Sequence, residues 1–212
     1  MIPKLHYLSQ GNTLQEHLGN IQKACTSGAE LVVLQLQQLK AKKLLPFAEE
    51  AREITAHFQT RLMIQDHYKI AKTIKADGVH FEKNPSSFST IRTHLYSWQL
   101  IGATAYHLDQ AQQLLPQELD YLYLGPYKNS VENPTTKALG ISGLTLLQEA
   151  LNTATPLLAF GEIDLQEVKE ILTTGISGLA VDEAITKNFN SIREFHRLLK
   201  ASSTQEQRHS FQ

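Results

Sequence analysis

Carboxylate and imidazole side chains follow short apolar segments at several places in this sequence. The stretch LLAFGEIDLQ places Gly161 and then Glu162 directly after an apolar run. Asp66 follows the run RLMIQ, His107 follows LIGATAY, and Asp182 follows ISGLAV. Groups of this kind can perform general acid–base chemistry, and carboxylates can hold a hard metal ion. The first question is therefore which structural elements bring these side chains together.

The stretch around Glu162 is an unusual place for a negative charge. An apolar strand, a glycine turn and the N-terminus of a helix together form a natural seat for an anion. Asp164 followed by Glu167 predicts an N-cap with its capping-box partner, so we expect a helix to begin at Asp164. Glu162 would then stand beside the anion seat. A simpler alternative is a solvated carboxylate near a helix end, contributing under about 1 kcal/mol.

Eight short apolar segments alternate with longer helical patterns along the chain. We expect strands at 4–9, 30–36, 61–66, 77–81, 99–105, 119–125, 156–161 and 176–182. The helical patterns cover 14–25, 45–58, 68–75, 85–95, 108–115, 141–152, 164–174 and 184–201. Continuous apolar strands that alternate with helices are typical of a parallel sheet covered by helices.

Eight such units in 212 residues predict an α/β fold, a single-domain (β/α)8 TIM barrel over residues 1–201. The last segment, 202–212, is polar, and we expect a C-terminal tail there. A doubly wound open sheet is the alternative, but HYLSQGN lacks the glycine-rich fingerprint expected after its first strand.

Composition is that of an ordinary globular protein. Twenty Lys and Arg balance 21 Asp and Glu, for a formal charge of −1, so charge gives no reason to expect nucleic acid or a membrane surface as a partner. A single cysteine, Cys25, excludes an internal disulfide and a cysteine zinc cluster. No apolar run approaches a membrane span of about 20 residues, and the first residues lack a signal-peptide core. We expect a cytoplasmic protein.

In a TIM barrel, functional side chains lie where the strands end. That rule selects Tyr7 and Ser9; Gln35, Gln37 and Gln38; Gln65, Asp66 and His67; His80 to Lys83; Thr104, Tyr106 and His107; Gly125 to Asn129; Gly161 and Glu162; Asp182 and Glu183.

These strand ends resemble the thiamine phosphate synthase and TenI family. The segments HYLSQG, IQDHYKIAKTIKADGVHF, DYLYLGPYKNS, ALGISGL, LLAFGEI and ISGLAVDEAI match the family in order, over nearly the whole chain. The resemblance implies thiamine biosynthesis. The synthase is a transferase that joins a pyrimidine methyl pyrophosphate to a thiazole phosphate and releases pyrophosphate, whereas some TenI relatives aromatise the thiazole phosphate. It also implies Mg²⁺, cations for the leaving group and backbone amides for the thiazole phosphate.

The sequence departs from the family at the positions that supply positive charge and at those that bind the metal ion. The family's Gln-x-Arg-x-Lys reads QLQQL here, so Gln35 keeps the implied pyrimidine-reading amide and Gln37 replaces the arginine. The family's Asn-Asp reads Gln65-Asp66, which keeps Asp66 as one implied Mg²⁺ ligand. Glu82 is the only acid near the expected second ligand position. One carboxylate predicts at best a weak Mg²⁺ site, so we favour a loop-tethering role for Asp66.

The leaving-group loop and the acid–base position also differ. The family's Thr-x-Thr-Lys is displaced, which leaves Lys137 as the candidate pyrophosphate cation, with Lys128 as the alternative. The TenI acid–base histidine aligns with Tyr106, and His107 follows it. Thr104, on the same strand, is a candidate substrate contact.

Acidic residues occupy the phosphate-binding positions that the resemblance implies. The family has Gly-Gly after the seventh strand and a small residue after the eighth, but here Gly161 is followed by Glu162, and Asp182 takes the small-residue position. Two carboxylates within about 6 Å of a phosphate repel it by several kcal/mol at an intermediate dielectric. We therefore expect Glu162 or Asp182 to occupy the amide pocket itself. Helix capping is the commoner role of such residues.

Three functions stay open. We favour a family member with degenerate Mg²⁺, pyrophosphate and phosphate motifs, weak or no synthase activity, and another small molecule or a protein as its ligand. An active synthase using Lys40, Glu82 and Lys137, or a TenI-like thiazole tautomerase, is the alternative. A third is a different reaction, such as that of a tautomerase or hydrolase, built on Asp66, His107 and Glu162. We expect a small-molecule ligand at the barrel mouth, no nucleic-acid or membrane partner, and a homodimer as one open state.

Overall fold

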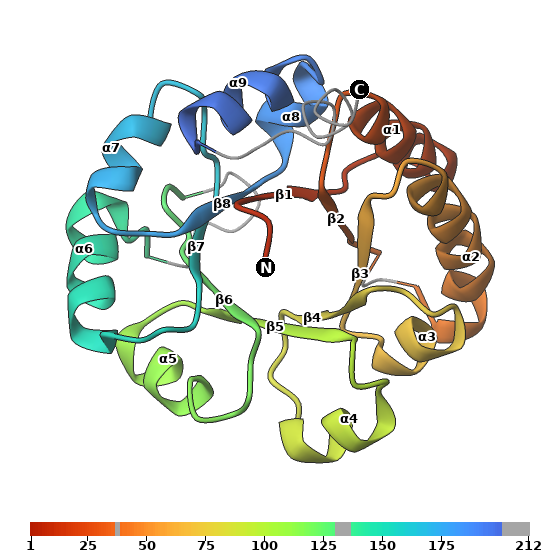
Figure 1. Cartoon of the computed structure of the whole chain (residues 1–212), viewed down its shortest axis with the longest axis horizontal. Helices are drawn as coiled ribbons and strands as arrows, with labels where there is room; N and C mark the ends of the chain where they lie inside the picture. Colours follow the sequence, from red (N-terminus) through yellow and green to blue (C-terminus); the bar gives the residue numbers. More distant parts are fainter. Residues whose placement is uncertain (37–38, 130–136, 201–212) are drawn as a thin grey trace, which may run out of the picture.

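Eight parallel strands close into a barrel with the helices outside it, as Figure 1 shows for the computed structural model. The structure describes residues 1–36, 39–129 and 137–200. The strands are β1 (Leu5–Leu8), β2 (Leu31–Leu34), β3 (Arg61–Gln65), β4 (Gly78–Phe81), β5 (Leu100–Ala105), β6 (Tyr121–Leu124), β7 (Leu157–Phe160) and β8 (Gly178–Val181). The barrel closes where Tyr7 of β1 pairs with Val181 of β8. The predicted TIM barrel is confirmed, and the predicted tail, 202–212, lies outside the described residues.

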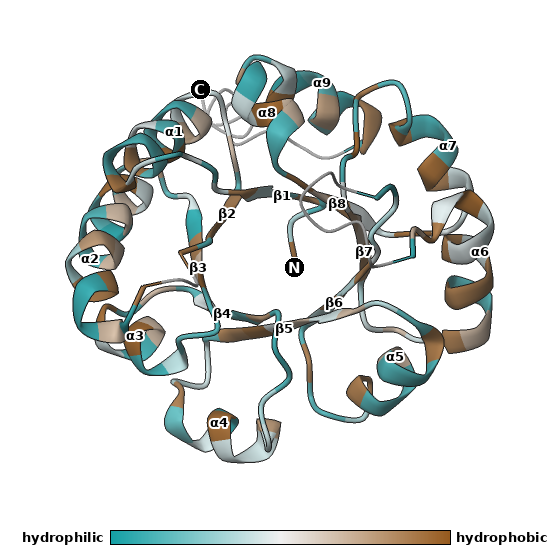
Figure 2. Ribbon diagram, turned by 180° about the vertical axis from the view of Figure 1, so that it is seen from behind, coloured by the Kyte–Doolittle hydropathy of each residue, from teal (hydrophilic) through white to brown (hydrophobic). Residues whose placement is uncertain are grey.

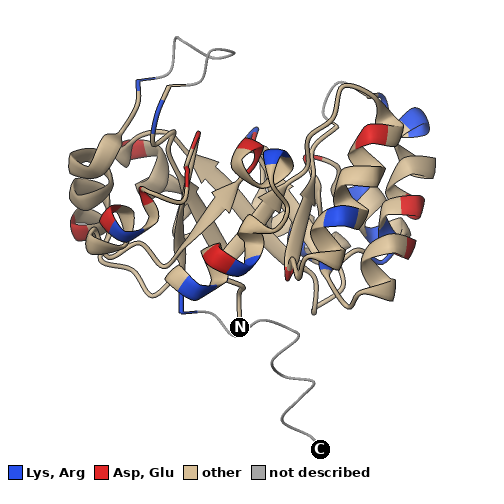
Figure 3. Ribbon diagram, turned by 90° about the horizontal axis from the view of Figure 1, so that it is seen from above, with Lys and Arg blue, Asp and Glu red and all other residues tan. Residues whose placement is uncertain are grey.

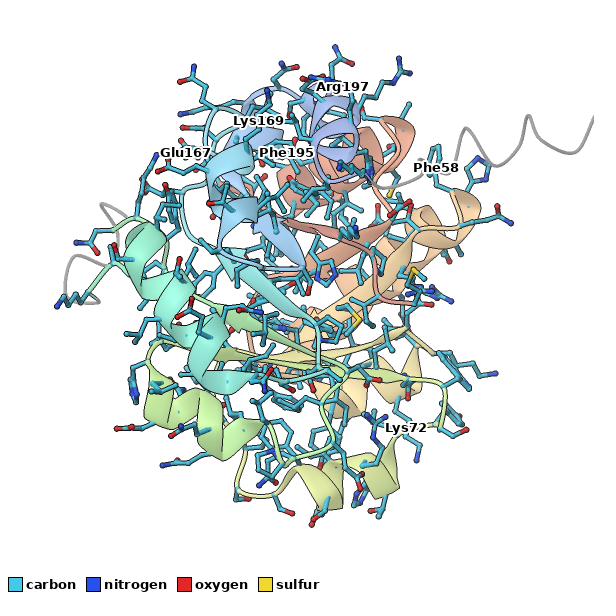
Figure 4. The ribbon with its side chains drawn as sticks, turned by 60° about the vertical axis from the view of Figure 1, so that its left-hand side comes forward. Phe58, Lys72, Glu167, Lys169, Phe195 and Arg197 are labelled. Carbon is cyan, nitrogen blue, oxygen red and sulfur yellow. The ribbon has the colours of Figure 1, made fainter. Side chains whose placement is uncertain are left out.

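The helices bury one face against the barrel. They are α1 (Leu14–Thr26), α2 (Ala41–His57), α3 (Tyr68–Thr73), α4 (Phe88–His94), α5 (Leu108–Leu114), α6 (Gly140–Leu151), α7 (Val168–Thr173), α8 (Glu183–Lys187) and α9 (Ser191–Leu198). Figure 2 shows hydrophobic patches on helix faces turned to the barrel. In Figure 4, Phe195 lies beneath α9 and Arg197 lies on its outer side, as expected for an amphipathic surface helix. No helix in the described ranges is long and apolar enough to cross a membrane.

Three predicted helices differ most from their predicted bounds. The helix α2 begins at Ala41, four residues before the predicted start, and includes Pro46. The predicted helix at 184–201 is two helices, because Asn188 takes an extended conformation (φ −152°, ψ 92°) after α8. The ring of Phe189, in the break, lies 6.2 Å from that of Tyr7, so a contact with the barrel accompanies the interruption.

The helix predicted to begin at Asp164 begins four residues later, at Val168. Only one of the two reciprocal hydrogen bonds of a capping box is present, because the Glu167 N–H donates to the backbone carbonyl of Asp164 and not to its side chain. The Asp164 N–H donates to Glu167 Oε2 over 2.9 Å, and the Glu167 N–H donates to the Asp164 carbonyl over 3.1 Å. These bonds close a turn that leads into α7, so the pattern located the turn and misplaced the helix.

Alternate strand residues fall into two separate buried clusters, one inside the barrel and one under the helices. The inner cluster contains Leu8, Leu31, Val33, Met63, Tyr121, Tyr123, Leu158 and Ala180. Successive side chains of a strand point to opposite faces. Continuing the inner set past Val33, Met63 and Ala180 places Gln35, Gln65 and Asp182 at the barrel mouth, the end at which the strands stop. The opposite end, where the strands begin, is called the base below.

Candidate functional site

The β3 end of the mouth carries a buried amide with no partner. Gln65 is 1% exposed, and neither its Oε1 nor its Nε2 has a hydrogen-bond partner. Both atoms are also shielded from solvent. Buried polar groups are nearly always hydrogen-bonded, because an unpaired one costs about 1–3 kcal/mol. An unpaired amide at the end of a barrel strand is therefore a candidate contact for a ligand.

The next residue, Asp66, ties two loops together. It has a left-handed backbone (φ +56°), and its Oδ1 accepts hydrogen bonds from the N–H groups of Glu82 (2.9 Å) and Lys83 (3.1 Å). Its Oδ2 is buried without a partner. The structure thus has Asp66 in the tethering position favoured from the sequence, with one carboxylate oxygen left over.

Glu82 reaches back into the barrel from the end of β4. Its Oε2 lies 3.0 Å from the Thr104 hydroxyl, and that hydroxyl lies 2.9 Å from His80 Nε2. Burial, with the negative charge of Asp66 as a smaller cause, raises the pKa of the Glu82 carboxyl above its usual range. Thr104, predicted as a substrate contact, is completely buried and has two partners inside the protein. The structure therefore gives it an internal role.

The side chains near Asp66 do not fit a Mg²⁺ ion held by the protein. Within the described ranges, no three His, Cys, Asp or Glu residues are grouped so that they could hold a metal. Asp66 Oδ1 already binds two amides, and Glu82 Oε2 already pairs with Thr104. Mg²⁺ requires six oxygens in near-octahedral geometry. The remaining carboxylate oxygen leaves room only for an ion carried in by phosphate oxygens of a ligand.

Tyr106 and His107, the two acid–base candidates after β5, point to different places. The Tyr106 ring packs edge-on against Phe160, with centroids 5.8 Å apart. Phe160 belongs with the cluster inside the barrel, so Tyr106 lies at the mouth. His107 is exposed, and its Nδ1 accepts the Gln110 N–H (3.3 Å) as the N-cap of α5. The structure thus brings Tyr106, and not His107, to the mouth.

The remaining predicted polar contacts belong to the segments that follow β2 and β6. The Gln35 N–H donates to Ser9 Oγ over 3.1 Å. Gln37 lies outside the described residues. Lys137, the candidate pyrophosphate cation, is exposed beside α6. Lys128 forms an ion pair with Glu167, and this hydrogen bond raises the pKa of the Lys128 ammonium. Figure 3 shows charged residues mainly on the helices and loops around the strands.

Gly161 joins the loops that follow β6 and β7. Its φ is +101°, and a Cβ at this position would lie 2.6 Å from Pro126 Cβ, so only glycine fits. Its carbonyl accepts the Lys128 N–H over 3.2 Å, and the Phe160 carbonyl accepts the Tyr127 N–H over 2.7 Å. Glu162 follows with a left-handed backbone, φ +47°. The predicted binding role of Gly161 thus has a structural alternative, which is the close approach of two loops.

Asp182 occupies the amide at the start of α8. Its Oδ1 accepts the Glu183 N–H over 2.7 Å, which makes Asp182 the N-cap. Burial raises the pKa of the Asp182 carboxyl, and the negative charges of Glu183 and Glu162 raise it further. Of the two acids expected at this pocket, Asp182 accepts the Glu183 N–H. Glu162 lies close enough for its negative charge to act on the Asp182 carboxyl.

Sequence reasoning missed the polar side chains inside the barrel. His6 Nδ1 lies 2.6 Å from the Tyr123 hydroxyl, and His80 Nδ1 lies 3.2 Å from the Tyr121 hydroxyl. Burial lowers the pKa of both histidines to about 3, so both rings are neutral at neutral pH. His80, a strand-end candidate from the sequence, is buried and hydrogen-bonded through both ring nitrogens. For His6, Tyr121 and Tyr123, the available signal was strand alternation, which places their side chains on the inner face of the barrel.

Comparison with known proteins gives consistent matches. The family model described as thiamine monophosphate synthase (TMP-TENI) matches residues 8–185. A thiamine-phosphate synthase from Flavobacterium psychrophilum is 31% identical over 204 residues, covering 94% of this chain and 99% of that protein. One from Flavobacterium johnsoniae is 30% identical over 192 residues, covering 89% and 91%. A solved thiamine phosphate pyrophosphorylase from Pyrococcus furiosus has a TM-score of 0.78 at 21% identity, covering 93% and 95%.

Proposed function

The chain belongs to the thiamine phosphate synthase and TenI family, and we propose that it is a member with weak or no synthase activity that binds a neutral heterocycle at the barrel mouth. The observation that carries the proposal is the 2.7 Å hydrogen bond from the Glu183 N–H to Asp182 Oδ1. The amide that would face a phosphate after β8 already has an anion, covalently attached as a side chain. A phosphate would have to displace it.

Electrostatics at the same rim favour this proposal. Glu162 lies near enough to Asp182 for its charge to raise the pKa of the Asp182 carboxyl. Adding a phosphate would bring a third anion to a half-buried place, where like charges repel by several kcal/mol. Lys128, a cation in the neighbouring loop, is paired with Glu167. The rim therefore supports exclusion of phosphate more than its capture.

The other side of the mouth supports a ligand that is polar but not anionic. The Gln65 amide is buried with a donor and an acceptor both unpaired. The rings of Tyr106 and Phe160 lie next to one another at the mouth, and aromatic faces favour flat ring systems. A heterocycle that carries an N–H beside a ring nitrogen or carbonyl would satisfy the amide. A pyrophosphate ester would also bring charge that this chain does little to neutralise.

Calorimetry separates the possibilities. We expect no heat from thiazole phosphate, or from pyrophosphate with Mg²⁺, at concentrations where an active synthase binds both. The double variant Glu162→Gly/Asp182→Ser should gain thiazole phosphate binding, because glycine also suits the backbone at φ +47°. Glu162→Gly/Asp164→Ser is the matched control, since it removes the same charge but leaves Asp182 on the amide. Equal affinity of both double variants would contradict the proposal.

An active synthase is the second candidate, supported by 31% identity over 94% of the chain to a protein named thiamine-phosphate synthase. Pyrophosphate release from the two family substrates tests it directly. Micromolar binding of both substrates with turnover would establish it and overturn the first proposal. Turnover of the thiazole phosphate alone would instead indicate a TenI-like tautomerase, in which Tyr106 stands at the family's acid–base position.

A further inference from the structure

Two aromatic side chains at the base of the barrel are exposed and stack on each other. Trp98 is 52% exposed and Tyr96 is 39% exposed, and their rings are nearly parallel (3°), with centroids 5.6 Å apart. Both belong to the connection between α4 and β5. Among the described residues, the other exposed large hydrophobic side chains are Met1 and Leu146. A single exposed ring is ordinary, but this aromatic pair forms a surface on which a flat ring can lie.

A lysine lies beside the aromatic pair. Lys72 belongs to α3, the neighbour of α4 around the barrel (Figure 1), and its Nζ lies 5.7 Å from the centre of the Tyr96 ring. Two acids at this end of the barrel, Asp77 and Asp120, are each paired with an arginine. Lys72 forms no ion pair with any residue that the structure describes. Its ammonium is therefore available to an anion from outside the chain.

A buried glutamine fixes the spacing between the rings and the lysine. Gln99 Oε1 accepts the Tyr96 N–H over 3.0 Å, and the Gln99 N–H donates to the Tyr96 carbonyl over 3.0 Å. Gln99 Nε2 donates to the carbonyl of Ala71, the residue before Lys72, over 3.0 Å. One side chain thus joins the segment that carries the rings to the helix that carries the lysine. A surface that is fixed before binding loses little conformational freedom when a ligand binds.

This arrangement selects the chemistry of a ligand. The ammonium lies over the Tyr96 ring, whereas Trp98, the more exposed ring, lies on the other end of that spacing. A ligand whose ring stacks on Trp98 therefore needs a spacer between this ring and its negative charge. A nucleoside phosphate has this form, with a flat base, a ribose as the spacer and a phosphate. Bases stack on aromatic side chains through their π faces, and lysine binds phosphate as a point charge.

We propose that Tyr96, Trp98 and Lys72 form a binding site for a nucleoside monophosphate, with its base on Trp98 and its phosphate on Lys72. At the mouth, a phosphate would meet the acids Asp182 and Glu162. At the base, it meets an ammonium that has no acidic partner among the described residues. The two sites lie at opposite ends of the barrel, so this inference does not rest on the proposed function.

Tryptophan fluorescence of the full-length protein tests the proposal, because Trp98 is the only tryptophan in the chain. We expect adenosine monophosphate to quench this fluorescence saturably at millimolar concentrations. Adenosine should bind about fivefold more weakly, because it lacks one exposed ion pair, and inorganic phosphate should leave the fluorescence unchanged. Equal affinities for the nucleotide and the nucleoside, or no saturable quenching by the nucleotide, would overturn the proposal. A fluorescence change that follows protein concentration without ligand would also overturn it, because a second copy of the chain would then cover the aromatic pair.

Two lysine variants separate pairing with the phosphate from general attraction. Lys72→Met should lower the affinity for adenosine monophosphate about fivefold, to that for adenosine. Lys69→Met is the matched control, because it removes the same charge from the same helix, at a position where Nζ lies 6.0 Å from the Tyr68 ring centre. Its affinity should stay that of the wild type, and equal losses in both variants would overturn the proposal.

A third variant tests the stacking surface. Tyr96→Leu keeps the tryptophan as the reporter and removes the ring beside it. It should weaken the binding of adenosine monophosphate and of adenosine by the same factor, because ring surface is lost along with the ring next to Lys72. Unchanged affinity for both compounds would overturn the role of the aromatic pair.

Discussion

Two glutamines, each 1% exposed, lie at opposite ends of the barrel and are treated in opposite ways. At the base, Gln99 Nε2 donates to the carbonyls of Ala71 (3.0 Å) and Ala76 (2.8 Å), and its Oε1 accepts the Tyr96 N–H (3.0 Å). At the mouth, both polar atoms of Gln65 are unpaired. The same type of side chain therefore has hydrogen bonds at both its polar atoms at the base and at neither of them at the mouth.

The aspartates repeat the contrast. At the base, Asp77 Oδ2 accepts the Leu62 N–H and pairs with Arg52 (2.7 Å), and Asp120 holds Ile101 and Arg92 in the same way. At the mouth, Asp66 Oδ2 has no partner and Asp182 sits among other acids. At the base, these carboxylates have hydrogen-bond and ion-pair partners that stabilise the fold. At the mouth, polar atoms lack such partners, as expected where a ligand binds.

The largest expected effect is the loss of stability when the Gln99 hydrogen bonds at the base are removed. Gln99→Met should destabilise the protein by about 2–4 kcal/mol, because it leaves the Ala76 carbonyl and the Tyr96 N–H without partners and removes one of the two hydrogen bonds to the Ala71 carbonyl. Urea unfolding followed by circular dichroism measures the change. A loss below about 1 kcal/mol would mean that the base does not depend on this tie.

The matched change at the mouth should have the opposite sign. Gln65→Met replaces two unpaired buried polar atoms with apolar ones of similar shape, so we expect stabilisation by about 1–2 kcal/mol in the absence of ligand. The same unfolding experiment compares it with Gln99→Met. If both variants lose stability equally, Gln65 is a structural residue and the contrast between the two ends fails.

The sequence predicted the strands better than the ends of the helices, for physical reasons. Strands follow from local apolar runs, so the β6 segment, predicted at 119–125, forms at Tyr121–Leu124. Glycine after β7 and an acid at the start of α8 are also local patterns. The break between α8 and α9 is not local, because Phe189 meets Tyr7, far away in the chain. Tertiary contact overrides helical propensity there.

The hydrogen bonds between polar side chains inside the barrel were not predicted from the sequence, for the same reason. His6 and Tyr123 are 117 residues apart, and only barrel closure brings their side chains within 2.6 Å. The inward register of Gln65 followed from strand alternation, but its lack of a partner depends on what its neighbours can reach. Pairing of polar groups is a property of the assembled site, and the sequence shows only the types of residue that enter it.

A smaller effect tests the acidic rim through pH. The pKa of the Asp182 carboxyl is raised in the folded protein, so the folded state binds a proton more tightly than the unfolded state. Stability therefore falls as pH rises from the ordinary value of 3.8 through the raised value, and stays reduced above it. Asp182→Asn keeps an acceptor for the Glu183 N–H and removes the charge. We expect it to be more stable than wild type near pH 7, by under about 1 kcal/mol.

That advantage should vanish below about pH 3.8, where the Asp182 carboxyl is protonated in both states. Thermal unfolding across pH 3–8 measures the difference. Asp164→Asn, at an exposed position of the neighbouring loop, is the control and should show no such dependence. If the stability difference between wild type and Asp182→Asn were the same at every pH, repulsion between the acids at the rim would not be its cause.

The smallest effect concerns the ion pair between Lys128 and Glu167, whose side chains are 42% and 20% exposed. Exposed pairs contribute little, so a double-mutant cycle of Lys128→Met and Glu167→Gln should give a coupling of about 0.5 kcal/mol that shrinks at high salt. At the base, the ion pairs are joined to strand N–H groups, and their coupling should be larger and less sensitive to salt. A cycle on Arg52 and Asp77 provides that reference. If the rim pair matched it in size and salt response, the mouth would be as rigidly built as the base, and Lys128 would be held in place as a structural residue. A weak, screened coupling instead leaves Lys128 free to exchange Glu167 for an anionic ligand, which is the one feature of the rim that an active synthase would need.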